Sequence, residues 1–123
     1  MSDSKNPFGP VIFSYPRAQA IEDGVLVDLS QIETIGKAFK FPVACTDTVW
    51  AIIENALNDE GQDILGIGHD LATMAIQAIR KVHGGDRLSF KVIIAGKPHT
   101  LKMIIGPGDT PEPVMTIMLP NED

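Results

Sequence analysis

Residues 71–105, LATMAIQAIRKVHGGDRLSFKVIIAGKPHTLKMII, decide the fold, because the spacing of their apolar side chains changes partway along. In the first part, six apolar residues recur at helical spacing and form one stripe: Leu71, Met74, Ala75, Ala78, Ile79 and Val82. Gly84 and Gly85 then end the helix. Beyond them, apolar and polar residues alternate on both sides of a turn at Gly96-Lys97-Pro98. The stretch therefore predicts a helix followed by a β-hairpin.

A third strand is predicted over 114–119, where Pro120 ends it. Three strands need a covering layer on one face, and the preceding helix with its apolar stripe is the natural cover. The second face mixes apolar and basic residues, namely Ile93, Ile104, Lys91 and Lys102. That mixture predicts a further cover for this face, either the segment 11–13 (VIF) or a second subunit.

The rest of the chain reads as short helices with identifiable starts and stops. Ser14 is predicted to cap a helix that begins near Pro16 and stops at Gly24. Residues 30–33 (SQIE) match a capping box, and Thr46 is predicted to cap a further helix. Residues 58–68 are polar and glycine-rich and read as a loop. We therefore predict an α+β fold with N-terminal helices packed on a C-terminal three-stranded antiparallel sheet.

Length and composition indicate one domain spanning 1–123, with loose ends at about 1–6 and 121–123. Hydrophobic residues make up 44% and charged residues 21%, as in ordinary globular proteins. The single cysteine, Cys45, allows no internal disulfide, which favours a reducing compartment. Because neither a signal peptide nor a membrane-spanning run is recognisable, we expect a soluble cytoplasmic protein that does not contact a membrane.

The charge of the chain is unevenly distributed. The formal net charge is -6, which argues against a general nucleic-acid binder. Yet six of the ten basic residues fall within 80–102: Arg80, Lys81, Arg87, Lys91, Lys97 and Lys102. Lys91 and Lys102 should share one face of the hairpin, with Arg87 and Lys97 at its two ends. This hairpin can receive an acidic partner. The alternative is a solubilising face whose lysines protect the edge of the sheet.

Three further residues are candidate anchors for a partner: Tyr15, Arg17 and Trp50. Trp50 lies off the main apolar stripe of its predicted helix. It can pack under a neighbouring loop or remain exposed for a partner, and packing is the commoner outcome for tryptophan.

No pattern in the sequence predicts a catalytic, metal or cofactor site. Cys45 precedes the Thr46 cap, where a helix N-terminus lowers a thiol pKa, but a small buried residue is the more ordinary interpretation. The three histidines, His69, His83 and His99, lack the spacing of metal ligands. Residues 106–109 (GPGD) superficially resemble a phosphate-binding loop, but prolines and a strand follow them. We read that loop as a rigid connection in which Asp109 bonds its own backbone.

Several long segments together resemble a known protein family: 14–28 (SYPRAQAIEDGVLVD), 39–44 (FKFPVA), 48–50 (TVW), 85–88 (GDRL), 106–109 (GPGD) and 112–120 (EPVMTIMLP). The family consists of small uncharacterised bacterial proteins, classed as a domain of unknown function and associated with plasmids, phages and integrated elements. The resemblance covers nearly the whole chain except the loop around 58–68. It implies a genetic setting, and it supplies no activity and no catalytic residues.

Three hypotheses about function follow. The leading one is a non-enzymatic protein-interaction module of a mobile genetic element, with an unknown host or element protein as partner and a homodimer as one form. The alternative is a nucleotide-handling protein, because residues 13–26 loosely resemble the start of ADP-ribosyltransferase-like folds; that similarity lacks the histidine and the catalytic glutamate. Nucleic-acid binding through the basic hairpin is third, and the net acidic charge weakens it.

Overall fold

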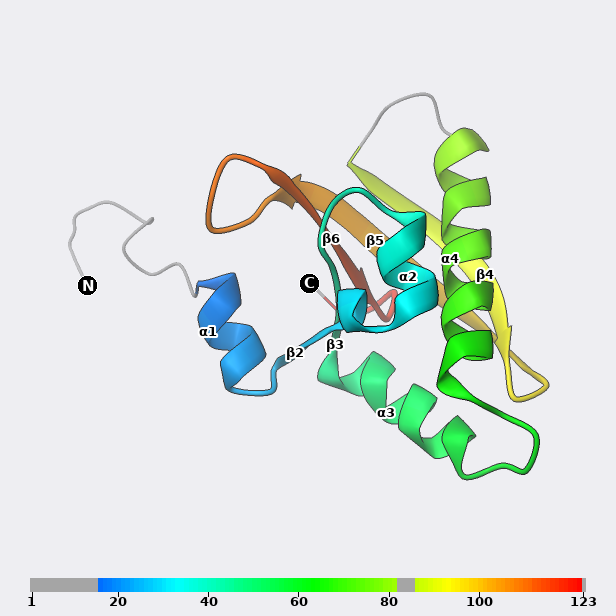
Figure 1. Cartoon of the computed structure of the whole chain (residues 1–123). Helices are drawn as coiled ribbons and strands as arrows, with labels where there is room; N and C mark the ends of the chain where they lie inside the picture. Colours follow the sequence, from blue (N-terminus) through cyan, green and yellow to red (C-terminus); the bar gives the residue numbers. More distant parts are fainter. Residues whose placement is uncertain (1–15, 82–85, 123) are drawn as a thin grey trace.

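The computed structural model describes residues 16–81 and 86–122, which form an α+β structure with one sheet. In chain order the described elements are α1 (Arg17–Glu22), β2 (Leu26–Asp28), the 3-10 helix η2 (Leu29–Gln31), α2 (Glu33–Ala38), β3 (Val43–Thr46), α3 (Asp47–Leu57), α4 (Ile64–Lys81), β4 (Arg87–Ile94), β5 (Lys97–Pro107) and β6 (Pro113–Met118). Figure 1 shows α2 and α4 lying against the sheet, with α1 set apart at one corner. None of the described helices is both long and apolar enough to cross a membrane.

The sheet is larger than predicted and is mixed. Its five strands lie in the order β2-β3-β6-β5-β4, whereas we expected only an antiparallel sheet of the last three. β3 pairs parallel with β6, and β2 pairs antiparallel with β3. β3 has only four residues, of which Val43, Ala44 and Cys45 are buried, so it lacks the alternation that marks a strand exposed on one side. This is why the sequence pattern did not reveal it.

The predicted hairpin is present, although its turn is shorter than expected. β4 pairs antiparallel with β5 from Arg87↔Ile104 to Ile94↔Lys97. The connection is therefore only Ala95 and Gly96, with φ values of 52° and 77°. Positive φ at both central residues is characteristic of the two-residue turn that matches the twist of the flanking strands. The prediction that Lys97 and Pro98 belong to the turn is therefore wrong, because both residues lie in β5.

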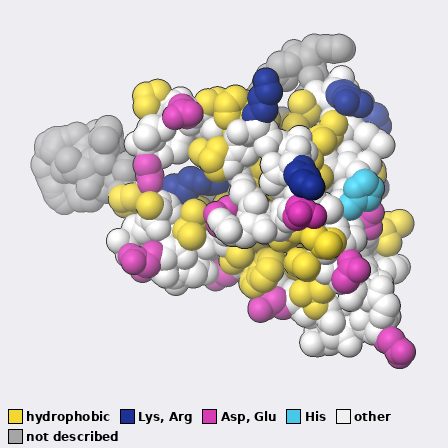
Figure 2. All heavy atoms as spheres, viewed as in Figure 1, with side chains coloured by type: hydrophobic (Ala, Val, Ile, Leu, Met, Phe, Trp, Pro, Cys, Tyr) yellow, Lys and Arg dark blue, Asp and Glu magenta, His cyan; other side chains and the backbone are white. Residues whose placement is uncertain are grey.

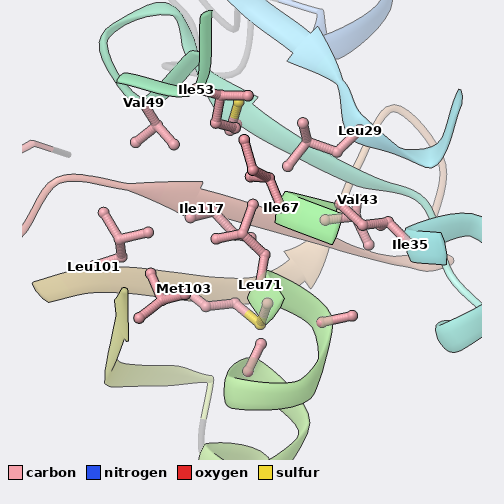
Figure 3. Packing of buried hydrophobic residues seen from close by; sticks show 14 of the residues in the cluster. Leu29, Ile35, Val43, Val49, Ile53, Ile67, Leu71, Leu101, Met103 and Ile117 are labelled. Atoms are coloured by element: carbon pink, nitrogen blue, oxygen red, sulfur yellow. The ribbon is translucent and has the colours of Figure 1, made fainter. Parts of the chain in front are cut away.

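The core lies between the sheet and the helices α2, α3 and α4. Along β4 exposed and buried residues alternate strictly, and the buried side chains face α4. In Figure 3, Leu101, Met103 and Ile117 from the central strands meet Ile67 and Leu71 from α4. The prediction that the long helix covers the sheet is confirmed. We call the opposite side of the sheet the open face; the segment 11–13, predicted to cover it, lies outside the described residues.

Helix starts agree with the sequence in one case and differ in two. Thr46 caps α3 as predicted, because its Oγ1 accepts a hydrogen bond from Val49 N at 3.4 Å. The capping box at 30–33 does not form. Instead, Ser30 Oγ accepts from Val43 N at 2.9 Å and so joins the chain before α2 to strand β3. α4 begins at Ile64, inside the predicted loop, where Asp63 Oδ1 accepts from Gly66 N at 2.6 Å.

Candidate functional site

Strand β4 forms one edge of the sheet. Within the described residues it pairs only with β5, so its other side is free of a strand partner. Asp86 O accepts a hydrogen bond from Ile105 N at 2.8 Å. This bond shows which residues of β4 direct their backbone groups toward β5. From there, every second residue of β4 bonds to β5, starting with Leu88 opposite Met103. The backbone N–H and C=O groups of Arg87, Ser89, Lys91 and Ile93 consequently point away from the sheet.

An apolar groove runs along this edge, between β4 and α4. We call it the edge groove, and its volume is about 520 Å³. Four residues of α4 and four of the hairpin line it: His69, Asp70, Thr73, Met74, Lys91, Val92, Ile93 and Pro98. Ile93 is 62% exposed, the largest exposed fraction among the large hydrophobic side chains described. A strand edge with outward-pointing backbone groups thus adjoins a hydrophobic groove.

Of the four predicted basic residues, three share a face of the sheet and one does not. The register places Ser89 opposite Lys102, and Lys91 opposite Thr100, so Lys91 and Lys102 lie on the open face as predicted. Arg87 shares that face at the other end of β4. Lys97 lies opposite the buried Ile94 and therefore on the helix-covered face of the sheet. Arg87, Lys91 and Lys97 are exposed, and within the described part of the chain none of them forms an ion pair.

Lys102 differs from the other cations because the chain itself engages it. It lies on the central strand β5 and its Nζ donates a hydrogen bond to the backbone oxygen of Glu122. Glu122, expected in a loose tail, is instead held in place: its Oε1 accepts from Thr46 Oγ1, Thr48 Oγ1 and Leu119 N, each at 2.8 Å. Burial alone raises the pKa of Glu122, but these hydrogen bonds and the charge of Lys102 outweigh it and lower that pKa. Lys102 therefore anchors the chain beyond β6.

The three predicted anchors do not gather beside the basic edge. Tyr15 lies outside the described residues. Arg17 begins α1 at the far corner of the open face, where its guanidinium donates to Thr116 Oγ1 at 2.7 Å and to Met115 O at 2.8 Å. Trp50 is partly buried in α3 and packs against the core cluster. Arg17 is thus hydrogen-bonded to β6 and Trp50 contacts the core, and both lie away from β4.

Asp109 fastens α1 to the strand connection between β5 and β6. Its carboxylate accepts hydrogen bonds from Arg17 N at 2.6 Å and Ala18 N at 2.9 Å, and these bonds lower its pKa. The predicted bonding of Asp109 to its own loop is therefore wrong: it caps a helix about ninety residues earlier in the chain. Burial lowers the pKa of Arg17, while Asp28 and Asp109 oppose that effect.

A second, larger groove of about 900 Å³ lies on the open face between α1, β6 and the 106–109 loop. Arg17 and Asp109, its two charged lining residues, are both engaged in the bonds that hold α1. A third surface is visible in Figure 2, where hydrophobic atoms gather between α2 and α3. Among the residues that the structure describes, neither surface combines cations without ion pairs and outward-pointing backbone groups, as the edge of β4 does.

Cys45 is fully buried in β3 and is a free thiol. Burial, followed by the charges of Glu122 and Asp47, raises its pKa to about 12. A protonated, inaccessible thiol is a poor nucleophile, so the structure supports the packing interpretation of this residue. Within residues 16–81 and 86–122, no group of three or more potential ligands is placed to hold a metal ion.

The sequence did not reveal the groove-lining residues of α4, namely His69, Asp70, Thr73 and Met74. Met74 belongs to the predicted apolar stripe, which favours a place in the core. The available signal was Ile93, an apolar residue on the mixed face of an alternating strand. Ile93 indicates a binding surface only when β4 is known to lie at the edge of the sheet.

Comparison with known proteins identifies the family of the chain. No curated protein and no solved structure matches the chain. A family model described as "Family of unknown function (DUF6573)" matches residues 8–123, which include every described helix and strand. The chain therefore belongs to this family of unknown function.

Proposed function

We propose that the protein is a protein-interaction module that binds an acidic partner through the edge of β4. The carrying observation is the coincidence of three features along one strand. Arg87 and Lys91 are exposed cations without an ion pair in the described chain, their backbone groups point outward, and an apolar groove lies beside them. Charged rims around an apolar centre are typical of protein interfaces.

The setting belongs to the same proposal. The resemblance to proteins of plasmids, phages and integrated elements supports a role in a mobile genetic element, acting in the cytoplasm on a host or element protein. Arg17 lies in the segment 13–26 on which the nucleotide-handling alternative rests, and it is hydrogen-bonded to β6. The alternative remains a prediction, and no contact of the described residues favours it.

Charge reversal tests the proposal. Tagged protein captures partners from host lysate, in parallel with an Arg87→Glu/Lys91→Glu variant and a control, Lys40→Glu/Arg80→Glu. All four residues are exposed and the two variants carry the same net charge. We expect a partner that wild type and control retain, that the β4 variant binds roughly tenfold or more weakly, and that about 0.5 M salt releases.

Two results would contradict it. Retention of the same partners by the β4 variant would remove these cations from the interface. Equal loss by both variants would show a dependence on net charge alone. Circular dichroism of all three proteins establishes that the exchanges leave the fold intact.

A further inference from the structure

We propose that the partner binds as an added β-strand on β4, as an extended segment in which acidic and apolar residues alternate. The inference rests on the proposed function, because it uses the same edge, and it specifies the chemistry and conformation of the segment bound there. Its apolar side chains enter the edge groove, and its carboxylates meet Arg87 and Lys91.

The backbone of β4 supplies the first part of the argument. Four alternate residues, Arg87, Ser89, Lys91 and Ile93, direct their N–H and C=O groups outward, and within the described chain no strand pairs with them. An extended peptide satisfies such a row by continuing the ladder, which is how strand addition provides affinity independent of sequence. The β-hairpin presents this edge over eight residues, Arg87–Ile94, without a proline.

The two sides of the edge select different side chains. Successive side chains of an added strand point to opposite faces of the sheet. On the helix side they meet the edge groove, whose wall there includes the apolar Met74 and Val92. Asp70 also lines that groove and disfavours a carboxylate there. The helix side therefore selects apolar residues.

On the open face, an added strand lies beside the exposed side chains of Arg87 and Lys91. Glu or Asp on this side would find two cations that no described acidic group neutralises. Alternation of acidic and apolar residues is thus the pattern that satisfies both sides at once.

The same charges argue against a second copy of the chain as the occupant. Pairing β4 with β4 of another copy would bring Arg87 and Lys91 of both copies onto one face. Like charges on adjacent strands destabilise a sheet, and lysines on an edge are a common protection against such pairing. The same cations that disfavour a second copy of β4 therefore favour an acidic segment.

A designed peptide tests the inference. The probe is a fluorescein-labelled peptide in which glutamate alternates with isoleucine or valine, and its binding is followed by fluorescence anisotropy at low salt. We expect binding that is lost when lysine replaces the glutamates and that weakens about tenfold with Arg87→Glu/Lys91→Glu. Thr73→Trp, which fills the edge groove, should weaken binding similarly, while Asn55→Trp on the exposed side of α3 should not.

Backbone methylation separates strand addition from simple charge attraction. Two further peptides carry N-methyl groups on either the glutamate or the apolar residues. Only one alternate set of amides can face β4, the glutamate set in antiparallel pairing and the apolar set in parallel pairing. Methylation of one set should therefore abolish binding, and methylation of the other should leave it intact.

Equal binding by the two methylated peptides, or no binding of the unmodified peptide, would overturn strand addition. So would sedimentation showing a dimer that Thr73→Trp dissociates and Asn55→Trp does not, because a second copy would then occupy the edge groove. These results are distinguishable from failure of the proposed function. If the peptides fail to bind, a lysate partner that only the β4 variant loses would still establish an interaction site. If the lysate contains no such partner, the peptide measurements are unaffected.

Discussion

At the scale of single residues, Glu122 shows how one carboxylate can secure a chain segment. Its Oε1 receives three hydrogen bonds, two from threonines at the start of α3 and one from Leu119 N. Thr46 is also the cap of α3, so the same hydroxyl serves the helix and the segment after β6. The carboxylate favours its charged form because these donors and Lys102 together outweigh the effect of its burial.

Glu122→Gln should therefore destabilise the protein in a pH-dependent manner. The folded state lowers the pKa of Glu122, so its stabilisation is fully present above the unfolded value of about 4.3 and disappears as the pH falls through the folded pKa. At pH 7 we expect a loss of about 1 kcal/mol, reduced by partial solvent exposure. Urea unfolding at several pH values checks this: the difference between wild type and variant should shrink in acid, and a constant difference would contradict the assignment.

At the scale of elements, the approach of α4 to α2 depends on Gly68. A Cβ at this position would lie 2.5 Å from Thr34 Oγ1 and 2.7 Å from Ile32 Cγ2, closer than side chains can pack. Thr34 Oγ1 also donates to Leu65 O at 3.0 Å, so the two helices are joined at the same place. The glycine that suggested a loop in the sequence is a contact point within a helix.

Gly68→Ala should lower stability, by up to about 2 kcal/mol. Overpacking costs about 1–3 kcal/mol, and alanine returns about 1 kcal/mol through its higher helix propensity. Gly66→Ala is the matched control, because a Cβ there meets only the side chain of Asp63 within 3.4 Å. Thermal unfolding compares the two variants, and a Gly68→Ala protein as stable as wild type would show that α2 and α4 do not require this approach.

The sequence predicts the elements whose patterns are local. The stripe of the long helix, the alternation of the hairpin and the Thr46 cap are all visible within short windows. The pattern does not predict β3, because its four residues are recognisable as a strand only from their partner β6, about seventy residues later. For the candidate site, Arg87 and Lys91 were identified, whereas the edge groove was not. Which strand forms the edge, and which helix residues lie beside it, depends on the order of the whole sheet.

At the scale of the whole molecule, β6 joins the two parts of the sheet. On one side it pairs with β3, which carries β2, and on the other with β5, which carries β4. Ile117, which is 2% exposed, lies opposite both Cys45 and Met103 in these ladders. The core on the helix side is likewise continuous from α3 to β4.

Unfolding should consequently be a single transition. Trp50, the only tryptophan, reports from α3. In a Trp50→Phe background, Thr100→Trp at an exposed position of β5 reports from the hairpin. We expect both probes to give the same urea midpoint, and Ile117→Ala to lower both equally, by about 3 kcal/mol. A hairpin that unfolds at a different urea concentration would show that β6 does not couple the two parts.

The place of β6 also has a consequence for biosynthesis. Although central in space, it follows every other described strand in the chain. While the ribosome is still making residues 113–118, β3 and β5 each have an edge awaiting the same partner. Translation proceeds at about 5–20 residues per second, so these apolar edges stay uncovered for seconds after β3 emerges. The nascent chain is then most open to intermolecular pairing, and a chaperone that shields extended segments would act in this interval.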